Sequence, residues 1–280
     1  MALFEILAYL AIGVGVMIAI GSVTFIGPSQ LSVLRENWRF RLREVSPYLG
    51  LLAGILAINK VARQVGPEIS WVVGLNITSY IYRIEGDFVA FVQSIATDQL
   101  TVYFSFIYLY GYVFLLVFPF ILTFALRETK YLKQTAVAFA LNYSLGLIFY
   151  ILFVSYGPRN LIPDLVDPLM YSMYPQSQLL TGEVNSNTNV FPSLHTSLSV
   201  TVAYLAWFTR DRFPYWFVTS CFLAASVVMA TMYLGIHWGT DVVAGTILGL
   251  GSVHIARKHY EIFEFLRVDL WALPVFNRLR

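Results

Sequence analysis

Residues 214–256 read PYWFVTSCFLAASVVMATMYLGIHWGTDVVAGTILGLGSVHIA, which is two apolar runs separated by a short polar segment. The runs, 214–236 and 240–256, are each close to the roughly 20 apolar residues that a helix needs to cross a bilayer. His237 lies between the runs and Asp241 lies at the start of the second run. The stretch therefore predicts two membrane-spanning helices with ionisable side chains at their junction.

The rest of the chain has the same apolar character. Hydrophobic residues make up 58% of the 280 residues and charged residues only 12%, whereas a soluble domain carries roughly 25% charged residues. We therefore predict an all-α polytopic membrane helix bundle with about seven transmembrane helices. The five further candidate spans are 3–26, 46–65, 101–126, 134–156 and 194–209.

Basic residues predict the direction of the spans. With seven spans, the four basic clusters fall on one side of the membrane, which the positive-inside rule makes cytoplasmic. The opposite connections, 66–100 and 157–193, are mainly acidic. We therefore expect a multi-pass protein of the cell membrane with its amino terminus outside and its carboxyl terminus inside. The clusters are Arg35, Arg39, Arg41 and Arg43; Arg127, Lys130 and Lys133; Arg210 and Arg212; and Arg257, Lys258, Arg267, Arg278 and Arg280.

The chain divides into three expected parts. Residues 1–45 would form an additional N-terminal transmembrane helix and a basic cytoplasmic loop, and residues 46–256 the main membrane domain. Residues 257–280 alternate basic and bulky apolar side chains, which is typical of a cytoplasmic tail along the inner leaflet. Within the main domain, the aromatic-rich segment 66–100 favours pieces that lie in the membrane interface.

Two short stretches carry the side chains suited to chemistry. The first, PSLH, contains Ser193 and His195 at the outer start of the fifth span. The second, HWGTD, runs from His237 to Asp241 at the outer junction of the last two spans. Between the histidines the chain crosses and returns, and two helices of about 20 residues at about 1.5 Å per residue bring it back to its starting depth. The spacing therefore predicts that the two imidazoles lie at one membrane level.

The residue types at these positions suit phosphoryl transfer. Asp241 follows His237 by four positions, so on a helix its carboxylate reaches the imidazole and raises the nucleophilicity of the other ring nitrogen. Ser193 stands where a helix N-cap belongs, and a helix start offers N–H groups and a favourable dipole to an anion. His195 beside it is placed to donate a proton to a phosphate ester oxygen.

Three other cations have two interpretations each. Arg159, just after Pro158, is equally well explained as an interface anchor or as a phosphate clamp, because its forked guanidinium suits phosphate oxygens. Lys60 and Arg63 lie near the end of the second span. Snorkelling to the interface is their first interpretation, and holding a lipid headgroup is the alternative.

The histidine cluster itself leaves other interpretations open. A single histidine at a membrane interface is usually an ordinary polar residue, a reading that two histidines with a carboxylate at matched depth weaken. A metal site would have only His195, His237 and Asp241 as ligands, so we expect no metal and no cofactor. A non-enzymatic transporter or channel that binds its cargo at the same cluster is the alternative function, although no inverted repeat is visible.

At the two stretches the sequence resembles the type 2 phosphatidic acid phosphatase superfamily, which also includes vanadium-dependent haloperoxidases. That family carries a Pro-Ser-x-His segment and, downstream, a His with an Asp four residues later, matched here by 192–195 and by His237 with Asp241. The resemblance implies that His237 is the nucleophile that forms a phosphohistidine, with Asp241 as its partner. It implies that His195 is the acid to the leaving group and that Ser193 binds the phosphate without a metal. The family's six-helix core would correspond roughly to 46–256.

Two usual features of the family are missing from these motifs. The family places Ser-Arg ahead of the second His, where this chain has Ala230 and Thr231. The Lys of the first family motif is not evident, and Pro158-Arg159 reverses the usual Arg-Pro order. Leucine follows the motif serine, as in the inositol phosphorylceramide synthase branch, which implies headgroup transfer as well as hydrolysis.

We therefore expect a membrane-embedded lipid phosphatase or phosphotransferase that works through a phosphohistidine. Its site would face the extracytoplasmic side of the membrane. The expected partners are a lipid phosphate and the bilayer, and no nucleic acid.

Overall fold

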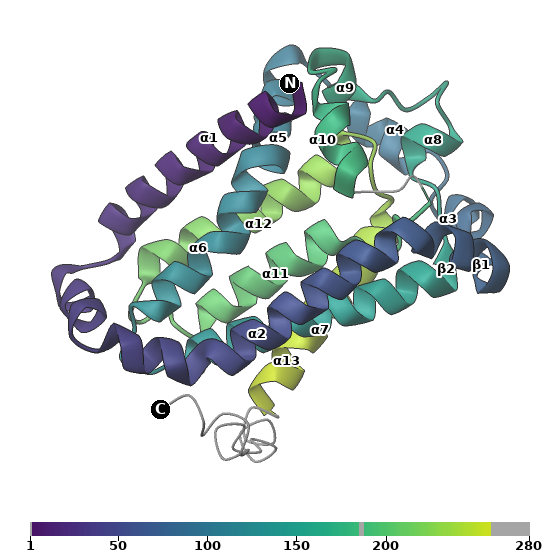
Figure 1. Cartoon of the computed structure of the whole chain (residues 1–280). Helices are drawn as coiled ribbons and strands as arrows, with labels where there is room; N and C mark the ends of the chain where they lie inside the picture. The colour runs from purple at the N-terminus through teal and green to yellow at the C-terminus, as the bar shows by residue number, and fades with distance from the viewer. Residues whose placement is uncertain (1, 185–187, 259–280) are drawn as a thin grey trace.

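Apolar helices long enough to cross a bilayer make up most of the computed structural model, which describes residues 2–184 and 188–258 (Figure 1). Within these residues six helical stretches have that length and hydropathy. The predicted all-α polytopic membrane fold is therefore confirmed. The long helices are α1 (Ala2–Phe25), α2 (Pro28–Val73), α5 (Asp98–Phe106) continued through the π-helical turn η1 (Ile107–Gly111) into α6 (Tyr112–Phe124), α7 (Lys130–Leu152), α12 (Pro214–Tyr233) and α13 (Gly239–Lys258).

Short helices gather at one end of the bundle and form what we call the cap, at the upper right of Figure 1. A two-stranded parallel pair, in which Leu75 lies opposite Phe153, ties the end of α2 to the end of α7. The cap helices are α3 (Thr78–Glu85), α4 (Phe88–Gln93), α8 (Pro158–Leu161), α9 (Leu169–Met173) and α10 (Ser177–Val184), and the strands are β1 (Leu75–Asn76) and β2 (Phe153–Val154).

Helix α2 is much longer than its predicted span, whereas the fifth span, predicted at 194–209, is short as a helix too. Helix α2 runs for 46 residues from Pro28, so the segment expected as a basic loop is helical. Arginine and glutamate are good helix formers, which is why a basic segment does not by itself end a helix. Helix α11 (Leu194–Trp207) has only 14 residues. At about 1.5 Å per residue it extends for about 21 Å, which is shorter than the roughly 30 Å hydrocarbon core of a bilayer.

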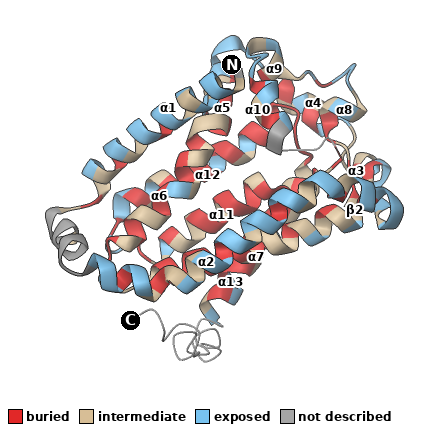
Figure 2. Cartoon of the chain, viewed as in Figure 1, coloured by how far each residue is buried: buried red, intermediate tan, exposed pale blue. Residues whose placement is uncertain are grey.

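Helix α11 lies at the centre of the bundle, packed against α7, α12 and α13. Its Ser197, Ser199 and Thr201 side chains are fully buried, and Asn142 of α7 donates from Nδ2 to Thr201 Oγ1 at 3.0 Å. Small polar residues allow close approach and hydrogen bonding between helices in a membrane. Figure 2 shows α11 as mainly buried, whereas the outward faces of α1 and α2 are exposed.

Two glycines of α13 let this helix meet α11 backbone to backbone. A Cβ added at Gly245 would lie 2.4 Å from the carbonyl oxygen of Ser193, and one added at Gly249 would lie 2.4 Å from that of Ser197. At this approach the Ser193 N–H donates to the Asp241 carbonyl at 3.1 Å. Small residues four apart are typical of tightly packed membrane helices. The contact joins the beginnings of the two helices that carry the histidine motifs.

The end of the bundle opposite the cap brings the basic clusters together. Arg212 Nη2 lies 2.6 Å from Glu128 Oε1, which joins the connection before α12 to the connection before α7. Lys133 Nζ lies 2.7 Å from Glu44 Oε1, which joins α7 to the basic part of α2. Three of the four clusters therefore share one end, as the sequence predicted. Of the tail 257–280, which was expected along the inner leaflet, residues 257–258 end α13 and residues 259–280 lie outside the described part of the chain.

The Gly249→Ala variant should be less stable than the wild type, because the new methyl group would meet the Ser197 carbonyl. We expect a cost of roughly 1–3 kcal/mol, as for other overpacked interiors, measured as a lower melting temperature in detergent. Gly251→Ala is the matched control, since nothing lies within 4 Å of its added Cβ and alanine favours a helix more than glycine does. Equal melting temperatures of the two variants would contradict the close backbone contact.

Candidate active site

His237 and Asp241 form a buried pair at the start of α13. Asp241 Oδ2 lies 3.3 Å from His237 Nδ1 and accepts the Trp238 N–H at 2.9 Å. Asp241 is fully buried and His237 is 4% exposed. A carboxylate bonded to one ring nitrogen fixes the orientation and the tautomer of an imidazole. The structure therefore contains the contact that the four-residue spacing suggested.

A tight turn between α12 and α13 carries His237. Gly235 has a φ of 68°, a conformation that favours glycine, and its carbonyl accepts the Arg159 N–H at 3.1 Å. Trp238 is fully buried, and its Nε1–H donates to the Tyr156 carbonyl at 2.8 Å. These bonds hold α8, which carries Arg159, against the turn that carries His237.

His195 lies in the first turn of α11 and faces His237. Their ring centroids are 5.9 Å apart, so the structure brings together the two imidazoles that the sequence placed at one depth. The ring of Tyr108 stacks on His195 at 4.6 Å between centroids, and that of Tyr112 packs at 4.5 Å. The two tyrosines belong to η1 and to the start of α6, and π-helical turns are frequent at functional sites.

Ser193 is the N-cap of α11, where the sequence placed it. Its Oγ accepts the Thr196 N–H at 3.3 Å, and the residue is fully buried. The first N–H groups of a helix lack partners within the helix and carry partial positive charge. Leu194 and His195 border the cavity described below, whereas Ser193 lies behind them. The helix start, rather than the serine side chain, therefore reaches this cavity.

The guanidinium of Arg159 lies over the ring of Tyr171, with 4.4 Å from Cζ to the ring centroid. Its Nη2 donates to the Tyr171 hydroxyl at 3.0 Å. Its buried Nη1 has no hydrogen-bond partner among the described residues. A buried donor without a partner is costly, so this nitrogen is suited to an incoming phosphate oxygen.

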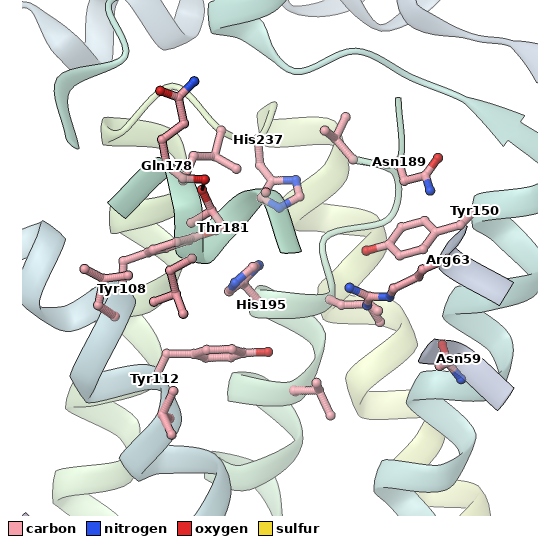
Figure 3. Close-up of a pocket in the computed structure, with 18 of the residues that line it drawn as sticks. Asn59, Arg63, Tyr108, Tyr112, Tyr150, Gln178, Thr181, Asn189, His195 and His237 are labelled. Atoms are coloured by element: carbon pink, nitrogen blue, oxygen red, sulfur yellow. Dashed lines mark hydrogen bonds between the residues drawn. The ribbon is translucent and has the colours of Figure 1, made fainter. Parts of the chain in front are cut away.

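A cavity of about 1000 Å³ connects these side chains. Figure 3 shows the imidazoles of His195 and His237 close together within it, and Arg159 forms part of its wall. Leu10 of α1 and Leu56 of α2 also line it. Ligand pockets usually measure roughly 300–1,000 Å³, so this cavity has room for a lipid headgroup and the first part of its chains.

Several residues of the site were not predicted as such from the sequence. Tyr108 and Tyr112 contact His195, and their four-residue spacing was the available signal, although it is equally typical of helix packing. Lys60 and Arg63 line the cavity, and both interpretations of these two residues stay predictions.

Glu85 of α3 is a further residue that local sequence does not reveal. It accepts the Gly239 N–H at 2.8 Å and also the Thr240 N–H. A carboxylate at this place satisfies the first N–H groups of α13 and suits the helix dipole. Its partners lie 154 and 155 positions away in the chain, so no short-range pattern could indicate them.

Burial holds the imidazole of His237 in its neutral form. Loss of hydration lowers its pKa to about 3, a hydrogen bond with Val190 opposes this shift, and the charge of Arg159 lowers the pKa further. A ring with a pKa this far below 7 is neutral near neutral pH and keeps a lone pair on one nitrogen. His237 is therefore suited to nucleophilic attack.

The comparison with protein families gives a direct match. A family model described as the PAP2 superfamily matches residues 83–255. The chain belongs to the PAP2 superfamily. The family expected from the two histidine motifs is therefore confirmed, without identification of a branch. No curated protein and no solved structure matched the chain in the corresponding searches.

The matched region includes both histidine motifs and the cap from residue 83 onward, so it begins after α2. Two parts of the cavity wall, from α1 and α2, therefore lie outside the PAP2 match. Within the described residues, no three or more His, Cys, Asp or Glu side chains lie together as a possible metal site.

Glu85→Ala should destabilise the start of α13, because the Gly239 and Thr240 N–H groups would lose their acceptor. The expected cost is roughly 1 kcal/mol, as for other lost helix caps, measured as a lower melting temperature. Glu68→Ala removes the same charge from an exposed position near the end of α2 and should leave the melting temperature unchanged. An equal effect of both substitutions would argue against a capping role of Glu85.

Proposed function

We propose that this PAP2 superfamily protein is a lipid phosphatase or phosphotransferase that works through a phosphohistidine and needs no metal. The observation that carries the proposal is the buried His237–Asp241 pair facing His195 across 5.9 Å between ring centroids. One imidazole is oriented by a carboxylate, and the other is within reach of a leaving group bound between them. This arrangement suits a nucleophile and a general acid.

In the first step, Nε2 of His237 attacks the phosphorus of a lipid phosphate ester. A nitrogen–phosphorus bond forms while the ester phosphorus–oxygen bond breaks, and His195 gives its proton to the departing oxygen. Asp241 accepts a hydrogen bond from Nδ1–H and stabilises the positive charge that develops on the ring. The products of this step are a phosphohistidine and a lipid alcohol.

In the second step, water or a second alcohol attacks the phosphohistidine. His195, now neutral, takes the proton of the attacking hydroxyl as the nitrogen–phosphorus bond breaks. Arg159 and the N–H groups at the start of α11 hold the phosphoryl oxygens throughout and stabilise their charge. Both histidines return to their starting protonation states, so the cycle needs no cofactor.

A lipid substrate is supported by the chemistry of the cavity wall. Polar side chains surround the histidines, and the wall continues into apolar side chains, among them Leu10, Leu109 and Val113. Leu10 belongs to α1, most of which is not buried by the rest of the chain. A phosphate group could therefore bind at the histidines while its chains extend toward the lipid phase.

The choice between water and an alcohol as acceptor belongs to the same proposal. Leu194 follows the motif serine, as in the inositol phosphorylceramide synthase branch, and it lines the cavity. An apolar side chain at this place is compatible with a lipid alcohol close to the phosphohistidine. We therefore propose transfer to an alcohol in addition to hydrolysis.

His237→Ala should lower the turnover of a lipid phosphate by roughly 10³-fold or more, as expected when a nucleophile is removed. The measurement is phosphate release from a panel of phospholipids in detergent, with and without candidate alcohol acceptors. His254→Ala is the control, because His254 is exposed on α13, the helix that follows His237, and lines a separate pocket with Tyr204 and Arg257.

Two results would refute this mechanism. Unchanged turnover of folded His237→Ala protein would exclude His237 as the nucleophile. Loss of wild-type activity on addition of EDTA would favour a metal-dependent reaction. A new phospholipid formed only when an alcohol is present would identify the transferase reaction.

The orientation that we propose places the cap and the active site outside and the basic end in the cytoplasm. In a Cys221→Ser background, a membrane-impermeant maleimide applied to intact cells should label Asp164→Cys in the cap. It should not label Asp211→Cys at the basic end until the cells are opened. Both positions are exposed, so the opposite labelling pattern would reverse the orientation.

A further inference from the structure

One face of α2 lines the active-site cavity. Leu56, Asn59, Lys60, Arg63 and Gln64 all border it, and their spacing of three and four positions is that of one helix face. Figure 3 shows Arg63 beside Tyr150, with its guanidinium pointing toward the side of His195. Its Cζ lies 6.0 Å from the centroid of the Tyr150 ring. These residues of α2 therefore face the cavity and not only the lipid phase.

The charges in the cavity wall are of one sign. Lys60, Arg63 and Arg159 all line it, and its described lining contains no Asp or Glu. His237 is neutral near neutral pH, because burial lowers its pKa. Several cations in a partly enclosed space attract an anion more strongly than the same charges would in water. A ligand with more than one negative charge matches this wall best.

The two cations of α2 come from outside the PAP2 match. That match begins at residue 83, and the matched part has Thr231 where the family usually has an arginine. Arg159 is one cation within the match that borders the cavity. Arg63 and Lys60 therefore add positive charge on the side of the cavity formed by α2.

We propose that Arg63 and Lys60 form an anion subsite that selects a phosphate group with at least two negative charges. The subsite favours a phosphomonoester or a diphosphate over a phosphodiester, which carries one negative charge per phosphate. Arg63 supplies the forked donor that suits phosphate oxygens, and Lys60 supplies a second charge. The substrate preference rests on the proposed function, whereas the existence of the anion site does not.

Binding of two stable probes tests the subsite without turnover. Inorganic phosphate at pH 8 is mainly a dianion, since such groups lose their second proton near pH 6 to 7, and dimethyl phosphate is a monoanion. We expect titration calorimetry on the detergent-purified full chain to show tighter binding of inorganic phosphate. Arg63→Gln should weaken the binding of inorganic phosphate about tenfold, as for loss of a charged hydrogen bond. The same substitution should weaken the binding of dimethyl phosphate by a smaller factor. Lys60→Gln should act in the same direction.

Two further variants separate charge from folding. Arg39→Gln removes an arginine from the other end of the same helix, where its guanidinium lies over Trp38, and should leave both affinities unchanged. Arg63→Lys keeps the charge and should retain more phosphate affinity than Arg63→Gln. Wild-type phosphate affinity in folded Arg63→Gln protein would overturn the subsite and leave the proposed reaction intact. Arg63-dependent phosphate binding without turnover of any lipid phosphate would refute the reaction and support the subsite.

Discussion

The backbone contact between α11 and α13 is the constraint on which the site depends. Because Gly245 has no Cβ, the Ser193 carbonyl can approach its main chain, and the Ser193 N–H reaches the Asp241 carbonyl at 3.1 Å. His195 and Asp241 lie in the first turns of the two helices. Their separation is therefore set by main-chain packing rather than by flexible side chains, which is how a catalytic arrangement is kept in place.

The cap and the added helices complete what the two central helices begin. The carboxylate of Glu85 holds the start of α13, and the Gly235 carbonyl holds α8, so that Arg159 borders the histidines. The PAP2 match covers this arrangement. Other parts of the cavity wall come from α1 and α2, which lie outside the match. Residues close to the reacting groups thus belong to the matched PAP2 region, whereas the cations that α2 adds to the cavity wall lie outside that region.

The sequence predicted those features that depend on local spacing. Apolar runs predicted the long helices, the interval between His237 and Asp241 predicted their contact, and Ser193 was recognised as an N-cap. The length of α2 was missed, whereas α11 ends only two residues before the predicted end of the fifth span. Arginine and glutamate do not end a helix, and a central helix enclosed by others need not match the bilayer thickness.

The composition and periodicity of the sequence were sufficient to predict that the chain lies in a membrane and that it is helical. They also predicted that a histidine pairs with a carboxylate. These properties follow from transfer free energies and from the helical repeat, which act over a few residues. Only the tertiary structure decided which cations line the cavity, which tyrosines contact His195 and which carboxylate caps α13. Such contacts join segments far apart in the chain, for example Glu85 and Gly239, which are 154 positions apart. They depend on how helices pack across small side chains, which no local pattern records.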